Sequence, residues 1–183
     1  MAFGSLSVKG RALRHLAQRE HSRAELERKL ARHVEDAPEA PAQAQIAAAL
    51  DDLAAKGLLS EARVAESVAR SHAQRYGSRR LKQTLQAKGL DPALVSATLQ
   101  QARGSELERA REIWRRRYGK PAANAAERAR QMRFLAGRGF ESDVIRRVMQ
   151  AAADGEDGTA ADDEGVLARG RFGSVTRPRG GGL

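Results

Sequence analysis

The scarcity of residues that favour β-strands is the feature that most constrains the fold of this chain. Only nine valines, three isoleucines and four threonines occur among the 183 residues, and aromatic residues make up 4%. An extended sheet draws on many more β-branched and aromatic side chains. Alanine, leucine, arginine, glutamate and glutamine, which all favour helices, dominate the composition instead. The sequence therefore predicts an all-α protein.

Helix start and stop signals divide the chain into about nine short helices. Ser22–Glu25 and Ser105–Glu108 each have the spacing of a capping box, in which serine and glutamate side chains bind free backbone N–H groups. Asp91-Pro92 is a further start signal, because aspartate caps a helix and proline suits its first position. Ser78 is expected to cap another helix.

An internal repeat groups these helices in threes. Lys88–Asp91 and the apolar residues that follow it recur 50 residues later as Arg138–Glu141 with its own apolar residues. A second similarity, between Arg75–Gly77 and Arg117–Gly119, lies upstream of these segments. We therefore predict three tandem three-helix modules, which are helix-turn-helix-like and cover residues 8–58, 59–103 and 104–153. Residues 154–183 are acidic, glycine-rich and finally arginine-rich, and we expect them to form a disordered tail.

The charge of the chain is strongly basic and unevenly distributed. Lysine and arginine number 33 against 23 acidic residues, which gives a formal net charge of +10. The net charge rises from +1 over residues 1–59 to +4 over 60–102 and +7 over 103–153, and it is −2 over 154–183. Most of the cations are arginines, whose planar guanidinium group suits phosphate and carboxylate. This balance favours a polyanionic partner such as nucleic acid.

The sequence contains none of the motifs expected of an enzyme or a metalloprotein. There is no cysteine, so disulfides, thiol catalysis and thiolate metal sites are excluded. Gly119-Lys120 is followed by proline where a Walker motif needs serine or threonine. No metal-binding spacing connects the four histidines, His15, His21, His33 and His72. We expect no catalytic, metal or cofactor site, no membrane partner, and a cytoplasmic location.

The basic clusters of the second and third modules are the remaining candidates for a binding site. The candidate DNA- or partner-binding residues are Arg79, Arg80, Lys82, Arg115, Arg116, Arg117, Lys120, Arg130, Arg133 and Arg138. The first three lie at the start of a helix, where free N–H groups also attract phosphate. The run Arg115–Arg117 has few acidic neighbours in the sequence. The alternative for each cluster is a solvated helix face, or pairing with acids such as Glu112 and Glu127.

Several blocks of this sequence resemble RecX, a family of bacterial regulatory proteins that modulate the RecA recombinase. The blocks are collinear, and they cover residues 16–30, 56–63, 77–81, 88–90 and 133–140. The resemblance extends over roughly residues 10–150 and leaves only the tail outside. It implies three tandem three-helix modules in an elongated, curved arrangement. It also implies binding in the groove of a RecA–single-stranded DNA filament, where ATP hydrolysis and strand exchange are inhibited.

We therefore expect a monomeric regulator that binds RecA and single-stranded DNA, and also duplex DNA without sequence readout. The alternative is a helix-turn-helix transcription regulator, since three-helix modules with basic helices can enter a major groove. Few asparagine or glutamine residues lie in the early turns of the presumed recognition helices, which counts against this alternative. A filament modulator should bind DNA with strong salt dependence and without preference for sequence.

Overall fold

A computed structural model describes residues 6–155, and within this range the chain forms nine α-helices and no strand. The helices are α1 (Val8–Leu16), α2 (Arg23–Leu30), α3 (Ala42–Ala55), α4 (Glu61–Ala73), α5 (Ser78–Ala87), α6 (Pro92–Arg103), α7 (Glu106–Arg117), α8 (Ala125–Gly137) and α9 (Ser142–Ala153). The predicted all-α class is confirmed. The predicted tail over 154–183 lies, from residue 156 onward, outside the described residues.

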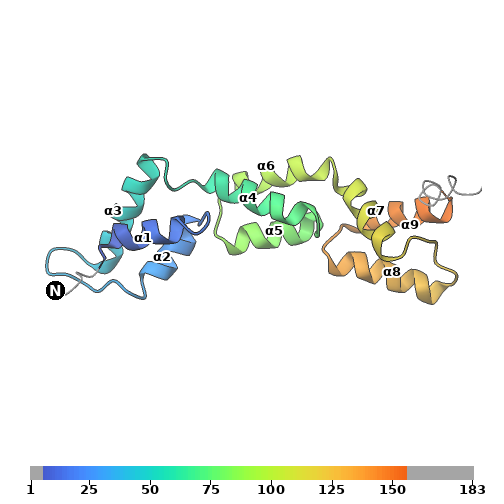
Figure 1. Ribbon diagram of the computed structural model, residues 1–183, viewed down its shortest axis with the longest axis horizontal. Coiled ribbons are helices and arrows are strands. Elements are labelled where there is room, and N and C mark those ends of the chain that lie inside the picture. Colours follow the sequence, from blue (N-terminus) through green and yellow to red (C-terminus); the bar gives the residue numbers. More distant parts are fainter. Residues whose placement is uncertain (1–5, 156–183) are drawn as a thin grey trace, which may run out of the picture.

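The helices form three groups of three along the long axis of the molecule (Figure 1), and we call these groups the first, second and third modules. Each module has its own cluster of buried apolar side chains, contributed by α1–α3, α4–α6 and α7–α9. Figure 1 shows an elongated row of these modules, and the buried residues of the described range form three separate clusters. The tandem three-helix arrangement predicted from the sequence is therefore confirmed.

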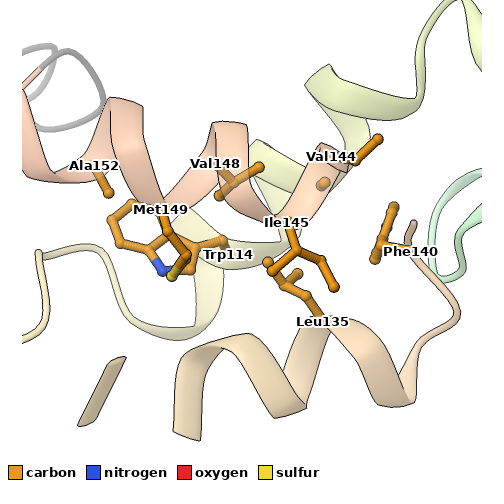
Figure 2. Packing of buried hydrophobic residues seen from close by; sticks show 9 residues of the cluster. Trp114, Leu135, Phe140, Val144, Ile145, Val148, Met149 and Ala152 are labelled. Carbon is orange, nitrogen blue, oxygen red and sulfur yellow. The ribbon is translucent and has the colours of Figure 1, made fainter. Parts of the chain in front are cut away.

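The core of the third module contains the only tryptophan of the chain. Trp114 is 1% exposed, and Figure 2 shows it beside Met149 and Ala152, with Phe140 at the other end of the cluster. The indole N–H donates a hydrogen bond of 2.8 Å to the side-chain oxygen of buried Gln131. This bond satisfies a donor that would otherwise be buried without a partner.

The repeated glycine turns have the same backbone structure in the second and third modules. Gly89 follows α5 with φ of 73°, and Gly139 follows α8 with φ of 80°. The next residue donates a backbone hydrogen bond five residues back in both turns, from Leu90 to Leu85 and from Phe140 to Leu135. This is the Schellman pattern, which needs a residue in the left-handed region after the helix. The repeat detected in the sequence is thus a structural repeat.

The similarity in sequence between Arg75–Gly77 and Arg117–Gly119 does not extend to the backbone conformation of their glycines. Gly119 has a positive φ of 67° after α7. Gly77 instead has a φ of −84° and is the N-cap residue of α5. The two glycines thus stand at opposite ends of helices, and the backbone of Gly77 packs directly against Gly139 and Phe140 of the third module.

Each glycine turn also joins its module to the preceding one. At the junction of the first and second modules, the Ser22 hydroxyl at the start of α2 donates a 2.5 Å hydrogen bond to the carbonyl of Lys88. The Lys88 ammonium forms a 2.9 Å ion pair with Glu25, also on α2. A Cβ atom on Gly89 would come within 2.8 Å of Ala24. The turn after α5 therefore sits on the first turn of α2.

The junction of the second and third modules repeats this arrangement one module further along. The N–H groups of Gly77 and Arg79 donate 3.0 Å hydrogen bonds to the carbonyls of Arg138 and Gly139. A Cβ atom on Gly139 would come within 2.7 Å of Arg80. The turn after α8 thus sits on the first turn of α5. Because both junctions use the same elements, the modules are added in a regular way, as in other repeat proteins.

Two predicted caps differ from the structure, and both changes occur at the second junction. Ser105 makes no side-chain cap, and its hydroxyl is instead bound by the guanidinium of Arg109. Ser78 is the first residue within α5, and its hydroxyl donates to Glu106 at 2.9 Å. The capping box of Ser22–Glu25 and the cap by Asp91 are confirmed. A contact between modules has replaced the cap at Ser78, and a contact within α7 has replaced the cap at Ser105.

Candidate nucleic-acid interface

A basic groove of about 500 Å³ lies where α7 and α8 meet the end of α4. It is lined by Gln74, Arg75, Tyr76, Ile113, Arg116, Arg117, Phe134 and Arg138. Four of these eight residues are arginines and none is acidic. We call this feature the arginine-aromatic groove.

The junction of the second and third modules positions both sides of the groove. Arg75 and Tyr76 directly precede Gly77, whose N–H donates to the carbonyl of Arg138 on the opposite side. The two sides are therefore tied together by backbone hydrogen bonds next to the groove. A site made in this way exists only when the two modules are docked.

Arginine and aromatic side chains stack on one another at the groove. The guanidinium of Arg138 lies 4.2 Å from the centre of the Phe134 ring, and that of Arg80 lies 4.5 Å from the centre of the Tyr76 ring. Tyr118 meets Phe134 edge-to-face, with 5.4 Å between ring centres. Such stacking holds a guanidinium plane in place while its N–H groups remain available to a ligand.

One acidic residue modifies the charge at the edge of the groove. Glu112 accepts hydrogen bonds from Arg115 at 3.2 Å and from Arg116 at 2.7 Å. Arg115 and Arg116 thus form the ion pairs with Glu112 that the sequence offered as the alternative to a binding role. Both pairs are exposed, so they are screened by solvent and can exchange for a phosphate ligand at little cost.

The structure brings together only some of the ten predicted site residues. Arg116, Arg117 and Arg138 line the groove, and Arg80 stacks on its Tyr76. The remaining six are exposed residues that do not line it, namely Arg79, Lys82, Arg115, Lys120, Arg130 and Arg133.

Sequence reasoning missed Arg75 and the two rings, Tyr76 and Phe134. Arg75 and Tyr76 were visible as part of the upstream similarity, but nothing in the sequence placed them next to α8. Phe134 lies within a block that resembles RecX, but the sequence alone did not place it at a binding site. Only the docking of the modules shows that these residues face a common groove.

A smaller cavity of about 240 Å³ lies beside the same junction, between α4, α6 and the start of α7. Its lining includes His72, Tyr76, Thr98 and Arg109. Burial, followed by the nearby charge of Arg80, lowers the pKa of His72 below its ordinary value. Burial also lowers the pKa of Arg109, whose guanidinium donates to the carbonyl of Ala102 at 2.9 Å. The lining of the cavity thus includes an imidazole whose charged form is disfavoured and a half-buried guanidinium.

A third hollow, of about 500 Å³, lies between α7 and α9 on the third module. Three arginines and two aspartates line it, together with two uncharged residues. The residues are Arg111, Arg146, Arg147, Asp143, Asp154, Gln150 and Ala151. Its mixed charge distinguishes it from the arginine-aromatic groove.

The arginine-aromatic groove has the composition of a site for a polyanion with planar groups. Guanidinium groups bind phosphate oxygens in a bidentate way, and aromatic rings offer surfaces on which nucleobases stack. Within residues 6–155, no group of three or more histidine and acidic residues is arranged to hold a metal ion. No helix in this range is both long and apolar enough to cross a bilayer.

Comparison with known families identifies the second and third modules individually. Residues 60–99 match the family described as the second three-helix domain of RecX, and residues 105–149 match the third. The matched ranges fall on α4–α6 and α7–α9.

Full-length relatives and solved structures agree with this assignment. A regulatory protein RecX from Leptothrix cholodnii is 54% identical over 147 residues, which cover 80% of this chain and 90% of the relative. One from Herminiimonas arsenicoxydans is 41% identical over 157 residues, 86% of this chain and the whole relative. The crystal structure of RecX from Lactobacillus salivarius superposes with a TM-score of 0.66 at 21% identity, covering 80% of this chain and 94% of that one. The chain therefore belongs to the RecX family of regulatory proteins.

Proposed function

We propose that this protein binds the RecA recombinase and its single-stranded DNA filament and inhibits ATP hydrolysis and strand exchange. It would act as a monomer in the cytoplasm, and so modulate recombination, DNA repair and the SOS response. Membership of the RecX family supports RecA as the partner. The composition of the arginine-aromatic groove supports contact with the DNA of the filament. Binding, without chemistry on the DNA, accounts for the whole effect.

The observation that carries the proposal is the composition of the arginine-aromatic groove. Arg75, Arg116, Arg117 and Arg138 surround Tyr76 and Phe134 in one hollow. Cations of this kind track a sugar-phosphate backbone, and rings contribute stacking that tolerates every base. The groove therefore supports contact with single-stranded DNA that has no sequence readout.

The arrangement of the modules supports binding along a filament. The three modules follow one another in a row (Figure 1), and the basic groove lies at the second junction, between segments 60–102 and 103–153 of net charge +4 and +7. An elongated protein can contact several neighbouring subunits of a filament, and it can place its basic groove on the DNA at the same time. We expect the less basic first module to contact RecA.

The test is RecA ATPase activity on single-stranded DNA with and without this protein. We expect steady-state hydrolysis to fall as the protein is added, and strand exchange to fall with it. The variant with Arg116, Arg117 and Arg138 replaced by glutamine should inhibit less. A control of equal charge change replaces Arg14, Arg28 and Arg32, which are exposed on the first module and lie outside the groove. This control should bind oligo-dT as tightly as the parent does, whereas the groove variant should bind it more weakly.

The same experiment can also refute the proposed function. If RecA turnover and filament length are unchanged at several-fold excess of the protein, the proposed function is wrong. Selective binding of one duplex sequence in the same experiment would favour a helix-turn-helix transcription regulator.

A further inference from the structure

We propose that the acidic segment 156–164 of this chain occupies the arginine-aromatic groove when no nucleic acid is bound. The segment would act as a tethered competitor that regulates the groove. This inference rests on the proposed function, because the ligand that would displace the segment is single-stranded DNA. It adds regulation of the groove by a segment of the same chain. Five of the nine residues in the segment are acidic and none is basic: the acids are Glu156, Asp157, Asp162, Asp163 and Glu164.

The charge of the groove matches that of the segment. Among the described residues the groove is lined by four arginines and no acid, and Glu112 at its edge is already shared between Arg115 and Arg116. The carboxylates of this segment would present the same kind of ligand as a phosphate backbone, namely several anionic oxygens along one chain. The groove that suits single-stranded DNA therefore also suits this segment.

The segment begins close to α7, the helix that contributes two of the groove arginines. Ala152 and Met149, in the last turns of α9, pack with Trp114 of α7 (Figure 2). Arg117 lies about one helical turn beyond Trp114 on the same helix. The chain thus enters the segment beside the helix that leads to the groove.

The segment is long enough to reach both sides of the groove. Nine extended residues span up to about 30 Å, whereas the 12 residues of α9 rise only about 18 Å from the turn next to Arg138. A tether of this length keeps the acids at an effective concentration of about the millimolar range. Even a weak contact is therefore populated until a ligand with more charges displaces it.

The hollow between α7 and α9 is the competing location, and its charge favours it less. It lies nearer to the start of the segment, since Asp154 is part of its lining. However, Asp143 and Asp154 offset two of its three arginines. Net attraction for an acidic peptide is therefore weaker there than at the arginine-aromatic groove.

A spin-label experiment tests where the segment lies. The sequence has no cysteine, so Thr159→Cys in the full chain gives a single attachment site for a nitroxide. We expect loss of NMR signal at the amides of Tyr76 and Arg117, which are far from residue 159 in the sequence. This loss should disappear at about 0.5 M salt, where the screening length falls to a few ångströms. It should also disappear when Asp157, Asp162 and Asp163 become asparagine and Glu164 becomes glutamine.

Two outcomes of this experiment would overturn the proposal. Signal loss confined to α9 and to the residues around Arg111 would place the segment in the hollow between α7 and α9. An unchanged spectrum would mean that the segment does not contact the folded modules.

A binding experiment tests the competition itself, with oligo-dT as the probe. At low salt the four-acid variant should bind oligo-dT several-fold more tightly than the parent. The control of equal charge change replaces Glu35, Glu39, Glu61 and Glu66 by glutamine, since these acids are accessible to solvent on the first two modules. A gain no larger than that of the control would overturn competition, because it would reflect net charge alone.

These measurements separate the two proposals, because neither of them uses RecA. Spin-label contact at Tyr76 together with undiminished RecA turnover would refute the proposed function and leave the inference standing. Inhibition of RecA without that contact would do the reverse.

Discussion

The buried carboxylate of Glu106, the first residue of α7, accepts hydrogen bonds from both the backbone N–H and the hydroxyl of Ser78, the first residue of α5, at 2.8 and 2.9 Å. At the start of α2 the corresponding glutamate belongs to the same helix, because Glu25 and Ser22 form a capping box. At α5 the glutamate comes from the next module. The start of α5 is therefore completed only when the second and third modules are docked.

Replacing Glu106 by alanine should destabilise this junction by about 1–3 kcal/mol, because two buried donors on Ser78 lose their acceptor. Urea unfolding measures the loss, and hydrogen exchange at the Ser78 amide localises it. Glu106→Gln keeps one acceptor oxygen and should cost less. Equal effects of the two substitutions would contradict the assigned role of the carboxylate oxygen.

Gly77→Ala should separate the second and third modules. Its Cβ would come within 2.5 Å of the backbone N and Cα of Phe140, where neither side can move without breaking the junction hydrogen bonds. We expect weaker oligo-dT binding together with a lower melting temperature. The matched control is Gly137→Ala in α8, whose Cβ meets nothing within 4 Å and which should stabilise the helix by up to about 1 kcal/mol. A melting temperature of Gly77→Ala equal to that of the parent would contradict the close approach.

The first junction should weaken in acid. Burial by itself would raise the pKa of Glu25, but hydrogen bonds from Arg19, Lys88 and the Ser22 N–H outweigh it and lower the pKa from 4.5 to about 2. The stability that Glu25 contributes, on the order of 2–3 kcal/mol, is thus present above pH 4.5 and is lost as the pH falls towards 2. Burial lowers the pKa of His21 below 6.5, so its contribution is full above that pH and also declines in acid.

Urea unfolding between pH 7 and pH 3 measures this dependence. The Glu25→Gln variant is unfolded in the same way, because the pH dependence that it retains comes from all the other ionisable groups. The difference in unfolding free energy between parent and variant should shrink as the pH falls below 4.5. A difference that stays constant over this range would mean that Glu25 titrates in the folded state as it does in the unfolded chain.

The groove arginines should set the salt dependence of DNA binding. Replacing Arg116, Arg117 and Arg138 by glutamine should weaken oligo-dT binding, because the cations that contact phosphate are removed. It should also flatten the log–log salt slope by up to about 0.7 per phosphate contact that is lost. Replacement of Arg14, Arg28 and Arg32 should leave the slope unchanged, and circular dichroism checks that both variants stay folded. Slopes that change equally would point to net charge and away from the groove.

The caps show how far local sequence decides structure in this chain. Ser22–Glu25 and Asp91-Pro92 form the caps that their spacing predicts, because every atom involved lies within four residues. Ser105–Glu108 has the same spacing and forms no capping box. The Ser105 hydroxyl is bound by Arg109, and Glu108, at the capping-box position, is bound by Arg111, so these local contacts replace the box. At Ser78 the cause is distant, because its hydroxyl donates to Glu106, 28 residues away, and no local pattern carries that information.

The sequence by itself determined the all-α class, the three-helix repeat and the glycine turns after α5 and α8, because helix propensity, apolar spacing and left-handed glycines act over a few residues. It also located the positive charge in the second and third modules. The tertiary structure decided which of the arginines share a site, since Arg75 and Arg138 face one groove only after Gly77 has docked on Gly139. That docking depends on backbone atoms about 60 residues apart, and side-chain patterns do not encode such contacts directly.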